Sequence, residues 1–234
     1  MLSLNEFFGH PKLVAFTSDS AVDYTFNEAA PFLTEAQKSM LSQAIGTPFS
    51  ALAWGKQVHG ADVVIVDDNF LKAGNLREAD AFVTDQKDVL IAVRTADCLP
   101  IFIWDQAHQA MGIVHAGWKS TQKEIARRTY EVMAARYHTD HKDLLIAFGP
   151  SIRSCCYQVN KEFAEYFPNA VSAQEGKLFM DLVKTNREQL AFLGVEHHQF
   201  FDSRVCTVCD PGYFSYRRDG EKAGRMISGL MLKG

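Results

Sequence analysis

Short segments rich in β-branched and aromatic residues recur through the middle of the chain, and they constrain its fold more than any other feature. Turn-forming residues separate them, and none is long enough to be an ordinary helix. The predicted strands are residues 62–66, 81–84, 89–93, 100–104, 110–115 and 144–148. Because strands are stable only when they pair, we expect these six to form a sheet.

Two further segments show helical periodicity. Thr121, followed three residues later by Glu124, resembles a capping box, and apolar residues then recur at helical spacing as far as Tyr137. Residues 178–193 carry leucines and a valine on one helical stripe. No linker, repeat or low-complexity tract divides the sequence, so we predict one α/β domain over residues 1–234.

The composition and charge of the chain limit the kinds of partner that it can bind. The chain has 234 residues, 47% of them hydrophobic, which is enough for a sizeable core, and its net charge of −4 does not favour nucleic acid. Residues 1–12 lack the features of a secretory signal, and no apolar run reaches the length of a membrane span. We therefore expect a soluble, cytoplasmic protein that binds neither nucleic acid nor membrane; its protein partners are not predicted.

The five cysteines predict reduced thiols, because their number is odd and two of them are adjacent. Neighbouring side chains such as Cys155 and Cys156 diverge too much for a disulfide or for good chelation of one zinc ion. Cys206 and Cys209 have metal-binding spacing, but one such pair supplies half of a closed zinc site. We expect both pairs to be structural.

Metal-capable side chains lie where predicted strands meet turns. His59 precedes one strand, Cys98 lies between two, and His115 ends another. Two imidazoles and a thiolate suit zinc or copper, and three protein ligands leave a fourth position for water or substrate. The separations along the chain match no short metal motif, so each residue alone could equally be a packed or surface side chain.

These residues belong to a series of seven short motifs. The motifs are 56–60 (KQVHG), 78–81 (EADA), 95–100 (TADCLP), 114–118 (VHAGW), 149–152 (GPSI), 155–159 (CCYQV) and 214–220 (FSYRRDG). They occur in the order found in the YfiH-type family, which this sequence resembles over roughly residues 50–230. The family carries the label of multicopper polyphenol oxidoreductase, or laccase-like protein, and is described as purine nucleoside phosphorylases with adenosine deaminase activity.

This resemblance implies a single-domain α/β/β/α layered fold with mixed sheets, and a zinc ion held by His59, Cys98 and His115, with copper as the alternative metal. It also implies phosphorolysis of adenosine, inosine, guanosine or methylthioadenosine, which yields the base and ribose 1-phosphate. Purine nucleoside and phosphate are then the expected partners.

Several residues beside the ligands are candidates for catalysis. Asp97, with Cys98 and His115, forms the predicted catalytic set, since Asp97 could orient a metal-bound histidine or act as a base. Asp80 and Glu78 are weaker carboxylate candidates.

Other residues near the motifs are candidates for binding substrate. Lys56 and Arg153 are expected to contact phosphate or substrate, and Gln57 to hydrogen-bond the substrate or to cap its turn.

The sequence departs from the family near its N-terminus. Family members have an arginine and a pair of glycines in this region, whereas residues 16–24 read FTSDSAVDY. If that arginine holds phosphate or substrate, activity here is weaker or altered.

Three other functions stay open on the sequence alone. The family label suggests a copper polyphenol oxidase, although eight scattered histidines without a His-x-His pair argue against a multicopper site. Cys98 with His115 as base would make a cysteine hydrolase or deamidase. The missing arginine suggests a metal-binding protein without catalysis.

Overall fold

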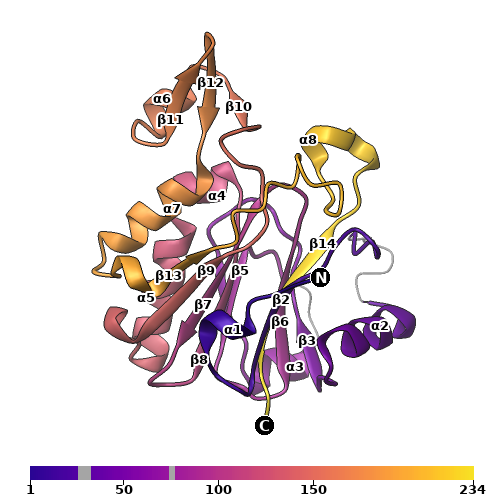
Figure 1. The fold of residues 1–234 in the computed structure, drawn as a ribbon. Helices are drawn as coiled ribbons and strands as arrows, with labels where there is room; N and C mark the ends of the chain where they lie inside the picture. Colours follow the sequence, from indigo (N-terminus) through magenta and orange to yellow (C-terminus); the bar gives the residue numbers. More distant parts are fainter. Residues whose placement is uncertain (26–32, 74–76) are drawn as a thin grey trace.

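Two large sheets lie face to face in the computed structural model, which describes residues 1–25, 33–73 and 77–234 (Figure 1). One has five strands, in the order β1 (Leu2–Ser3), β2 (Leu13–Thr17), β14 (Met226–Leu232), β6 (Val89–Thr95) and β3 (Ala51–Ala53). The other has six, in the order β13 (Phe200–Asp202), β9 (Leu144–Phe148), β7 (Leu99–Asp105), β8 (Ala110–Ala116), β5 (Ala81–Thr84) and β4 (Val63–Ile65).

Both large sheets are mixed. Most neighbouring strands are antiparallel, but β3 pairs with β6, β4 with β5, and β13 with β9 in parallel. All six predicted strands form, with ends that differ by at most two residues. Strands β5 to β8 are buried along their whole length because layers cover both faces, which explains why their sequences show little alternation.

Helices cover the two outer faces, so the architecture is the expected α/β/β/α arrangement. Between the sheets lies a core with residues from both, among them Ile91, Phe102 and Leu230. On the outer face of the six-stranded sheet, apolar residues of α5 (Ile125–Tyr137) and α7 (Leu182–Ala191) join a second cluster. Leu41 of α2 (Glu35–Ile45) packs on the five-stranded sheet.

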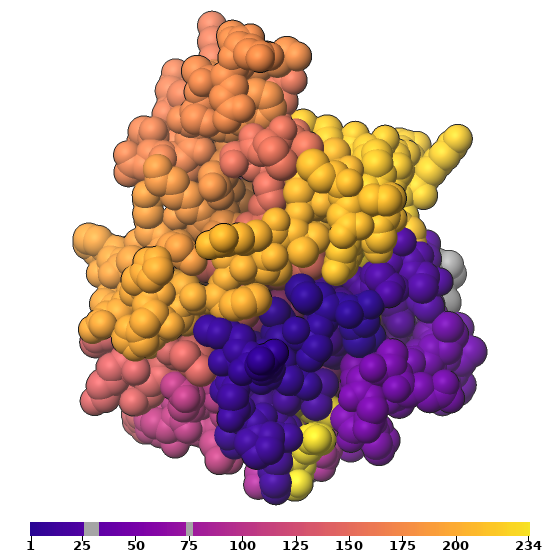
Figure 2. All heavy atoms as spheres, in the orientation of Figure 1, coloured from indigo at the N-terminus to yellow at the C-terminus, as the bar shows by residue number. Residues whose placement is uncertain are grey.

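Smaller elements complete the chain. The segment after β9 forms an antiparallel sheet in the order β10 (Gln158–Val159), β12 (Lys177–Met180) and β11 (Val171–Gln174), which projects from one end of the molecule in orange (Figure 2). The other helices are α1 (Asn5–Phe8), α3 (Asp68–Ala73), α4 (Trp118–Gln122), α6 (Phe163–Tyr166) and α8 (Tyr216–Asp219), with 3-10 turns η1 (His141–Asp143), η2 (His197–Gln199) and η3 (Gly220–Lys222).

The predicted capping box at Thr121 and Glu124 is wrong. Thr121 lies inside α4, and its amide bonds to the carbonyl of Gly117. Glu124 has a φ of 58°, a left-handed conformation that ends the first helix and redirects the chain into α5. The expected helix therefore forms as two.

The helical stripe predicted over residues 178–193 also forms two elements, strand β12 and helix α7. Between them, the side chain of Asp181 accepts a hydrogen bond of 2.9 Å from the amide of Lys184 and so caps α7. Leu178 belongs to the strand, although its position also fits the helical spacing. Among the described residues, we find no helix with the length and apolar character needed to cross a membrane.

Met133 of α5 is fully buried against the six-stranded sheet, so we expect its substitution to lower the stability of the protein strongly. Met133→Ala should lower the free energy of unfolding by about 2–5 kcal/mol, because a cavity would remain beside Gly112, where the Met133 sulfur lies. Urea unfolding followed by circular dichroism measures this. Glu131→Ala, an exposed change in the same helix that removes an ion pair with Arg127, should cost only about 0.3–0.5 kcal/mol. Equal effects of both substitutions would contradict this account.

Candidate metal centre

Cys98 and His115 meet because of strand pairing. Residue 98 directly precedes β7, and His115 lies near the end of β8, opposite Pro100 in the antiparallel register. The chain reaches Cys98 from Thr95, the last residue of β6, so the short segment 96–98 crosses from the five-stranded sheet to the six-stranded sheet. The thiol is thus held between two strand ends.

His59 lies on a loop that wraps the carboxylate of Asp80. The carboxylate accepts hydrogen bonds from the amides of Val58 (3.2 Å), His59 (3.0 Å) and Gly60 (2.7 Å). His59 itself has a φ of 56°, in the left-handed region that histidine adopts more often than most residues. Since Asp80 is fully buried, these bonds fix the backbone of the loop that carries His59.

The same carboxylate also orients His115. Its Oδ1 lies 2.7 Å from Nδ1 of His115, whose side chain is almost completely buried. An ionised carboxylate can only accept, so Nδ1 carries a proton and Nε2 is the nitrogen left to bind a metal ion, which would replace any proton there. Burial raises the pKa of Asp80, but the hydrogen bond and charge of His115 and the loop amides outweigh it and lower that pKa. Asp80 therefore stays ionised.

Three possible metal-donor atoms lie close together beside the residues that Asp80 holds. The Sγ of Cys98 lies 3.8 Å from Nε2 of His59, and one donor atom from each of His59, Cys98 and His115 lies within 4.8 Å of the others. Tetrahedral zinc with ordinary bond lengths would separate a sulfur and a nitrogen ligand by roughly 3.6 Å. The residues present therefore fit a metal of this kind.

The centre also favours a thiolate. Burial raises the pKa of Cys98, but the charge of His115 and hydrogen bonds from both histidines outweigh it and lower that pKa to about 6. Reciprocally, burial lowers the pKa of His115, while the Cys98 thiolate and Asp80 raise it to about 9. A thiolate at neutral pH is required of a metal ligand and of a cysteine nucleophile alike.

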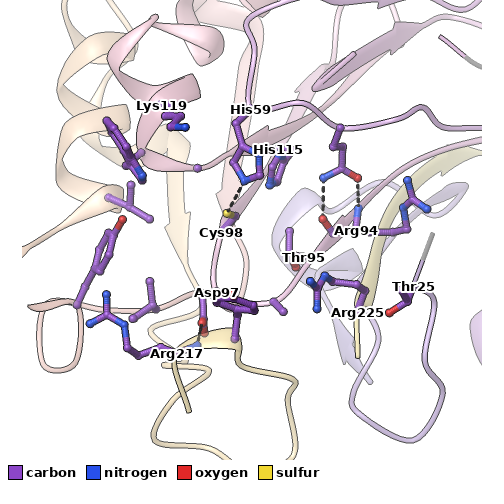
Figure 3. Close-up of a pocket in the computed structure, with 18 of the residues that line it drawn as sticks. Thr25, His59, Arg94, Thr95, Asp97, Cys98, His115, Lys119, Arg217 and Arg225 are labelled. Carbon is purple, nitrogen blue, oxygen red and sulfur yellow. Dashed lines mark hydrogen bonds between the residues drawn. The ribbon is translucent and has the colours of Figure 1, made fainter. Parts of the chain in front are cut away.

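A cavity of about 640 Å³ opens onto the three donors, within the roughly 300–1,000 Å³ typical of small-molecule sites. Figure 3 shows His59, Cys98 and His115 at its centre, with Arg94, Thr95 and Arg225 to one side and Lys119 and Arg217 to the other. Apolar and aromatic residues complete the wall: Trp118, Ile152, Tyr157, Leu182 and Tyr216.

Comparison with known proteins identifies the family. Residues 29–233 match the family described as multi-copper polyphenol oxidoreductase laccase. The chain belongs to this laccase-like family.

Relatives within the laccase-like family carry other names. A protein of Clostridium acetobutylicum named purine nucleoside phosphorylase is 34% identical over 76% of this chain and 75% of its own. A protein of an unknown prokaryotic organism, named adenosine deaminase RL5, is 29% identical over 94% and 88%. The crystal structure of YlmD from Geobacillus stearothermophilus superposes with a TM-score of 0.84 at 26% identity, over 97% and 95% of the chains. Membership thus supports an enzyme.

Two of the three residues expected to bind substrate line the cavity. Gln57 does so while its amide is bonded to the main chain of Arg94, with Nε2 donating at 2.7 Å and Oε1 accepting at 2.8 Å. Lys56 lines the cavity too, with its ammonium 3.6 Å from Glu78. Gln57 therefore ties its loop to strand β6.

Arg153 has a different position from the one expected. Its guanidinium forms an ion pair of 2.7 Å with Asp202 and donates to the carbonyls of Gly149 and Val205. Arg153 is not among the described residues that line the cavity. It joins the loops that follow β9 and β13.

Asp97 lines the cavity, but the carboxylate that meets a histidine is that of Asp80. The Asp97 carboxylate accepts hydrogen bonds of 2.6 Å from the hydroxyl of Thr207 and 2.6 Å from the amide of Arg217. With a φ of 91°, Asp97 shapes the sharp turn before Cys98. The sequence analysis ranked Asp80 too low, and its place directly before a predicted strand was the only signal in the sequence.

The sequence analysis also missed several cations of the cavity, namely Arg94, Lys119 and Arg225. Arg94 is the last residue but one of a buried strand, where a charged residue is unusual, and this could have indicated a functional position. Arg225 precedes β14, whose residue Met226 pairs with Thr95. The strand pairing that brings Arg225 to the site is invisible in local sequence.

We predict that Asp80→Asn weakens zinc binding about 10–100-fold, because the neutral amide neither fixes the His115 tautomer nor supplies charge behind it. Competition with a chromophoric chelator at fixed pH measures the affinity. Asp62→Asn, an exposed change close by, is the control and should leave the affinity unchanged. Unaltered affinity in Asp80→Asn would show that the carboxylate does not support the site.

Gly117→Ala should abolish or greatly weaken metal binding at the same site. A Cβ at this position would lie 2.8 Å from Cδ2 of His59 and 3.1 Å from the Cys98 sulfur, so both ligands would have to move. The measurement is bound zinc per chain, with the thermal midpoint as a check on folding. A folded variant with full zinc content would contradict the observed geometry.

Proposed function

We propose that this chain is a zinc-dependent purine nucleoside phosphorylase that also deaminates adenosine. The observation that carries the proposal is one cavity lined both by the three donors, His59, Cys98 and His115, and by a pair of guanidinium groups. The names of its relatives, purine nucleoside phosphorylase and adenosine deaminase, point the same way.

Arg94 and Arg225 form the proposed phosphate-binding side. Burial lowers the pKa of Arg94 to about 10, and the charge of Arg225 contributes to this shift. Like charges in a partly buried space repel, so an anion between them would relieve the repulsion and gain charge-assisted hydrogen bonds. The hydroxyl of Thr95, buried and without a hydrogen-bond partner in the part of the chain described, lies on the same side.

The aromatic wall suits the purine. Trp118, Tyr157 and Tyr216 offer flat apolar surfaces on which a base can stack, and Ile152 and Leu182 add aliphatic contacts. With phosphate on the arginine side and base on the aromatic side, the ribose would lie across the three donors.

His59, Cys98 and His115 would hold the zinc ion, and its open position would supply a Lewis acid next to the substrate. Asp80 keeps His115 in the tautomer that presents Nε2, and the low pKa of Cys98 keeps its sulfur ionised near neutral pH. Asp97 holds the turn that positions Cys98.

In phosphorolysis a phosphate oxygen bonds to the anomeric carbon of the ribose while the glycosidic C–N bond breaks. The bonding electrons and a proton go to the purine, and ribose 1-phosphate forms. Arg94 and Arg225 would orient the phosphate for attack and the aromatic wall would hold the base, so positioning lowers the barrier. In deamination, water replaces the amino group of adenosine, and inosine and ammonia form.

The test is to purify the protein without added metal, to quantify bound zinc and copper, and to incubate it with adenosine with and without phosphate. Phosphate-dependent release of adenine supports the proposal, and inosine reports deamination. Cys98→Ala should lose the metal at this site and at least about 100-fold of the activity. A Cys98→Ala protein with unchanged metal and unchanged turnover would refute the site.

Further assays of the same protein, with phenols and with amide substrates, separate the other functions. Bound copper with oxidation of phenols would favour the polyphenol oxidase. Hydrolysis of amide substrates by metal-free protein would favour a cysteine hydrolase that uses Cys98 and His115, and bound zinc without turnover would favour a binding protein. Each of these results would overturn the proposal that the chain is a phosphorylase.

Arg225→Gln should raise the KM for phosphate roughly 10–100-fold, with a smaller change in the KM for adenosine, because a charge-assisted hydrogen bond contributes about 1.5–3 kcal/mol. Initial rates at varied phosphate and at varied nucleoside give the two constants. Arg128→Gln, which removes an exposed cation from α5, is the control. If the two constants rise equally in Arg225→Gln, this arginine does not bind phosphate.

A further inference from the structure

Four cysteines outside the cavity converge, although the sequence analysis treated them as two pairs without predicting that the pairs meet. One sulfur from each of Cys155, Cys156, Cys206 and Cys209 lies within 4.8 Å of the other three. The Sγ atoms of Cys156 and Cys209 are 3.4 Å apart, and those of Cys155 and Cys209 are 3.8 Å apart. All four are free thiols.

Parallel strand pairing explains the convergence. Strands β9 and β13 are parallel neighbours, so the loops that follow them leave the sheet at the same edge. An isolated bridge pairs Ser151 with Cys206, and the salmon and orange chain after residue 150 lies against the yellow chain beyond residue 200 in Figure 2. Each loop brings one pair of cysteines.

Cys155 and Cys156 can both face the centre because they lie in a tight turn and not in a strand. The amides of Cys156 and Tyr157 both bond to the carbonyl of Arg153, at 2.9 and 2.8 Å. This curls the backbone so that the two sulfurs both approach Cys209. The divergence expected of adjacent side chains applies to extended chain and does not hold in this turn.

We infer that these four cysteines form a closed zinc site with a structural role, separate from the proposed catalytic centre. Four thiolates at a Zn–S distance of about 2.3 Å lie about 3.8 Å apart in a tetrahedron, close to the observed sulfur separations. Cys206-x-x-Cys209 supplies half of the ligands, and Cys155-Cys156 supplies the other half. Binding would release the thiol protons to solvent.

One of the four sulfurs is held by main-chain donors. Backbone amides of Cys209, Arg153 and Val208 donate hydrogen bonds to the Cys206 sulfur. Such amide donors support thiolate ligands in metal sites.

Cationic side chains also hold the two loops. Arg217 donates to the carbonyl of Cys156 at 3.3 Å, and Arg218 donates to that of Thr207 at 2.8 Å. Cys155 and Cys209 are exposed, so a metal ion can enter from solvent.

The position of this cluster indicates what the metal would do. The amide of Ile152 donates to the carbonyl of Asp97 at 2.9 Å, and the hydroxyl of Thr207 donates to its carboxylate. These two residues lie three positions before Cys155 and one after Cys206. A metal that joins the two loops would therefore fix the turn before Cys98.

The experiment measures metal and not activity, so it does not depend on which reaction the protein catalyses, but the expected counts include the zinc ion that the proposed function places at Cys98. Protein produced with zinc and purified under reducing conditions should contain about two zinc ions per chain, and Cys98→Ala about one. The double variant Cys206→Ser, Cys209→Ser should also contain about one. An unchanged zinc content in the double variant would overturn the proposal.

If the double variant does not fold, cobalt substitution in Cys98→Ala tests the same site. In this background the four-cysteine site should bind one cobalt(II) ion with the intense visible absorption of tetrathiolate cobalt. In addition, Cys155 and Cys209, although exposed, should resist alkylation until a chelator removes the metal. Weak absorption, immediate alkylation of both thiols, or disulfides found by mass spectrometry of the unreduced protein would each show that the cluster is not a metal site.

Discussion

The buried carboxylate of Asp80 is the interaction on which the candidate metal centre depends. An ionised carboxylate without solvent is costly unless donors surround it, and here one imidazole N–H and three amides do so. These four donors fix the loop of His59 and the ring of His115 together. Because Asp80 directly precedes β5, and β5 pairs with β8, the sheet itself sets the distance between the two histidines.

The third ligand depends on the face-to-face packing of the sheets. Cys98 ends the short crossing from β6 to β7, so its place is set by both sheets at once. The same crossing brings Arg94 and Thr95 from the five-stranded sheet to the donors of the six-stranded sheet, and the pairing of β14 with β6 adds Arg225. A cavity at such a junction combines groups that no single sheet could present on one face.

The sequence predicted six strands to within two residues, because β-branched runs bounded by turns are a local signal, but it missed β2 and β14 of the five-stranded sheet. It misplaced the start of α5 and the division between β12 and α7, where a left-handed Glu124 and the cap at Asp181 decide the boundary. Ordered motifs brought His59, Cys98 and His115 together as candidates. The partners of Arg153 and Asp97 could not be predicted, since both depend on contacts between loops far apart in the sequence.

Hydrogen bonds of Asp97 connect the candidate metal centre at Cys98 with the loops that carry the four-cysteine cluster. Its main chain precedes Cys98, and its carbonyl and carboxylate are held by Ile152, Thr207 and the amide of Arg217. A ligand that binds the folded state alone stabilises it in proportion to its affinity and concentration. Metal at the four-cysteine site would order the loops that hold Asp97, and metal at Cys98 would order the other side of the same turn. Because the two sites share this segment, their contributions to stability should be coupled and not simply additive.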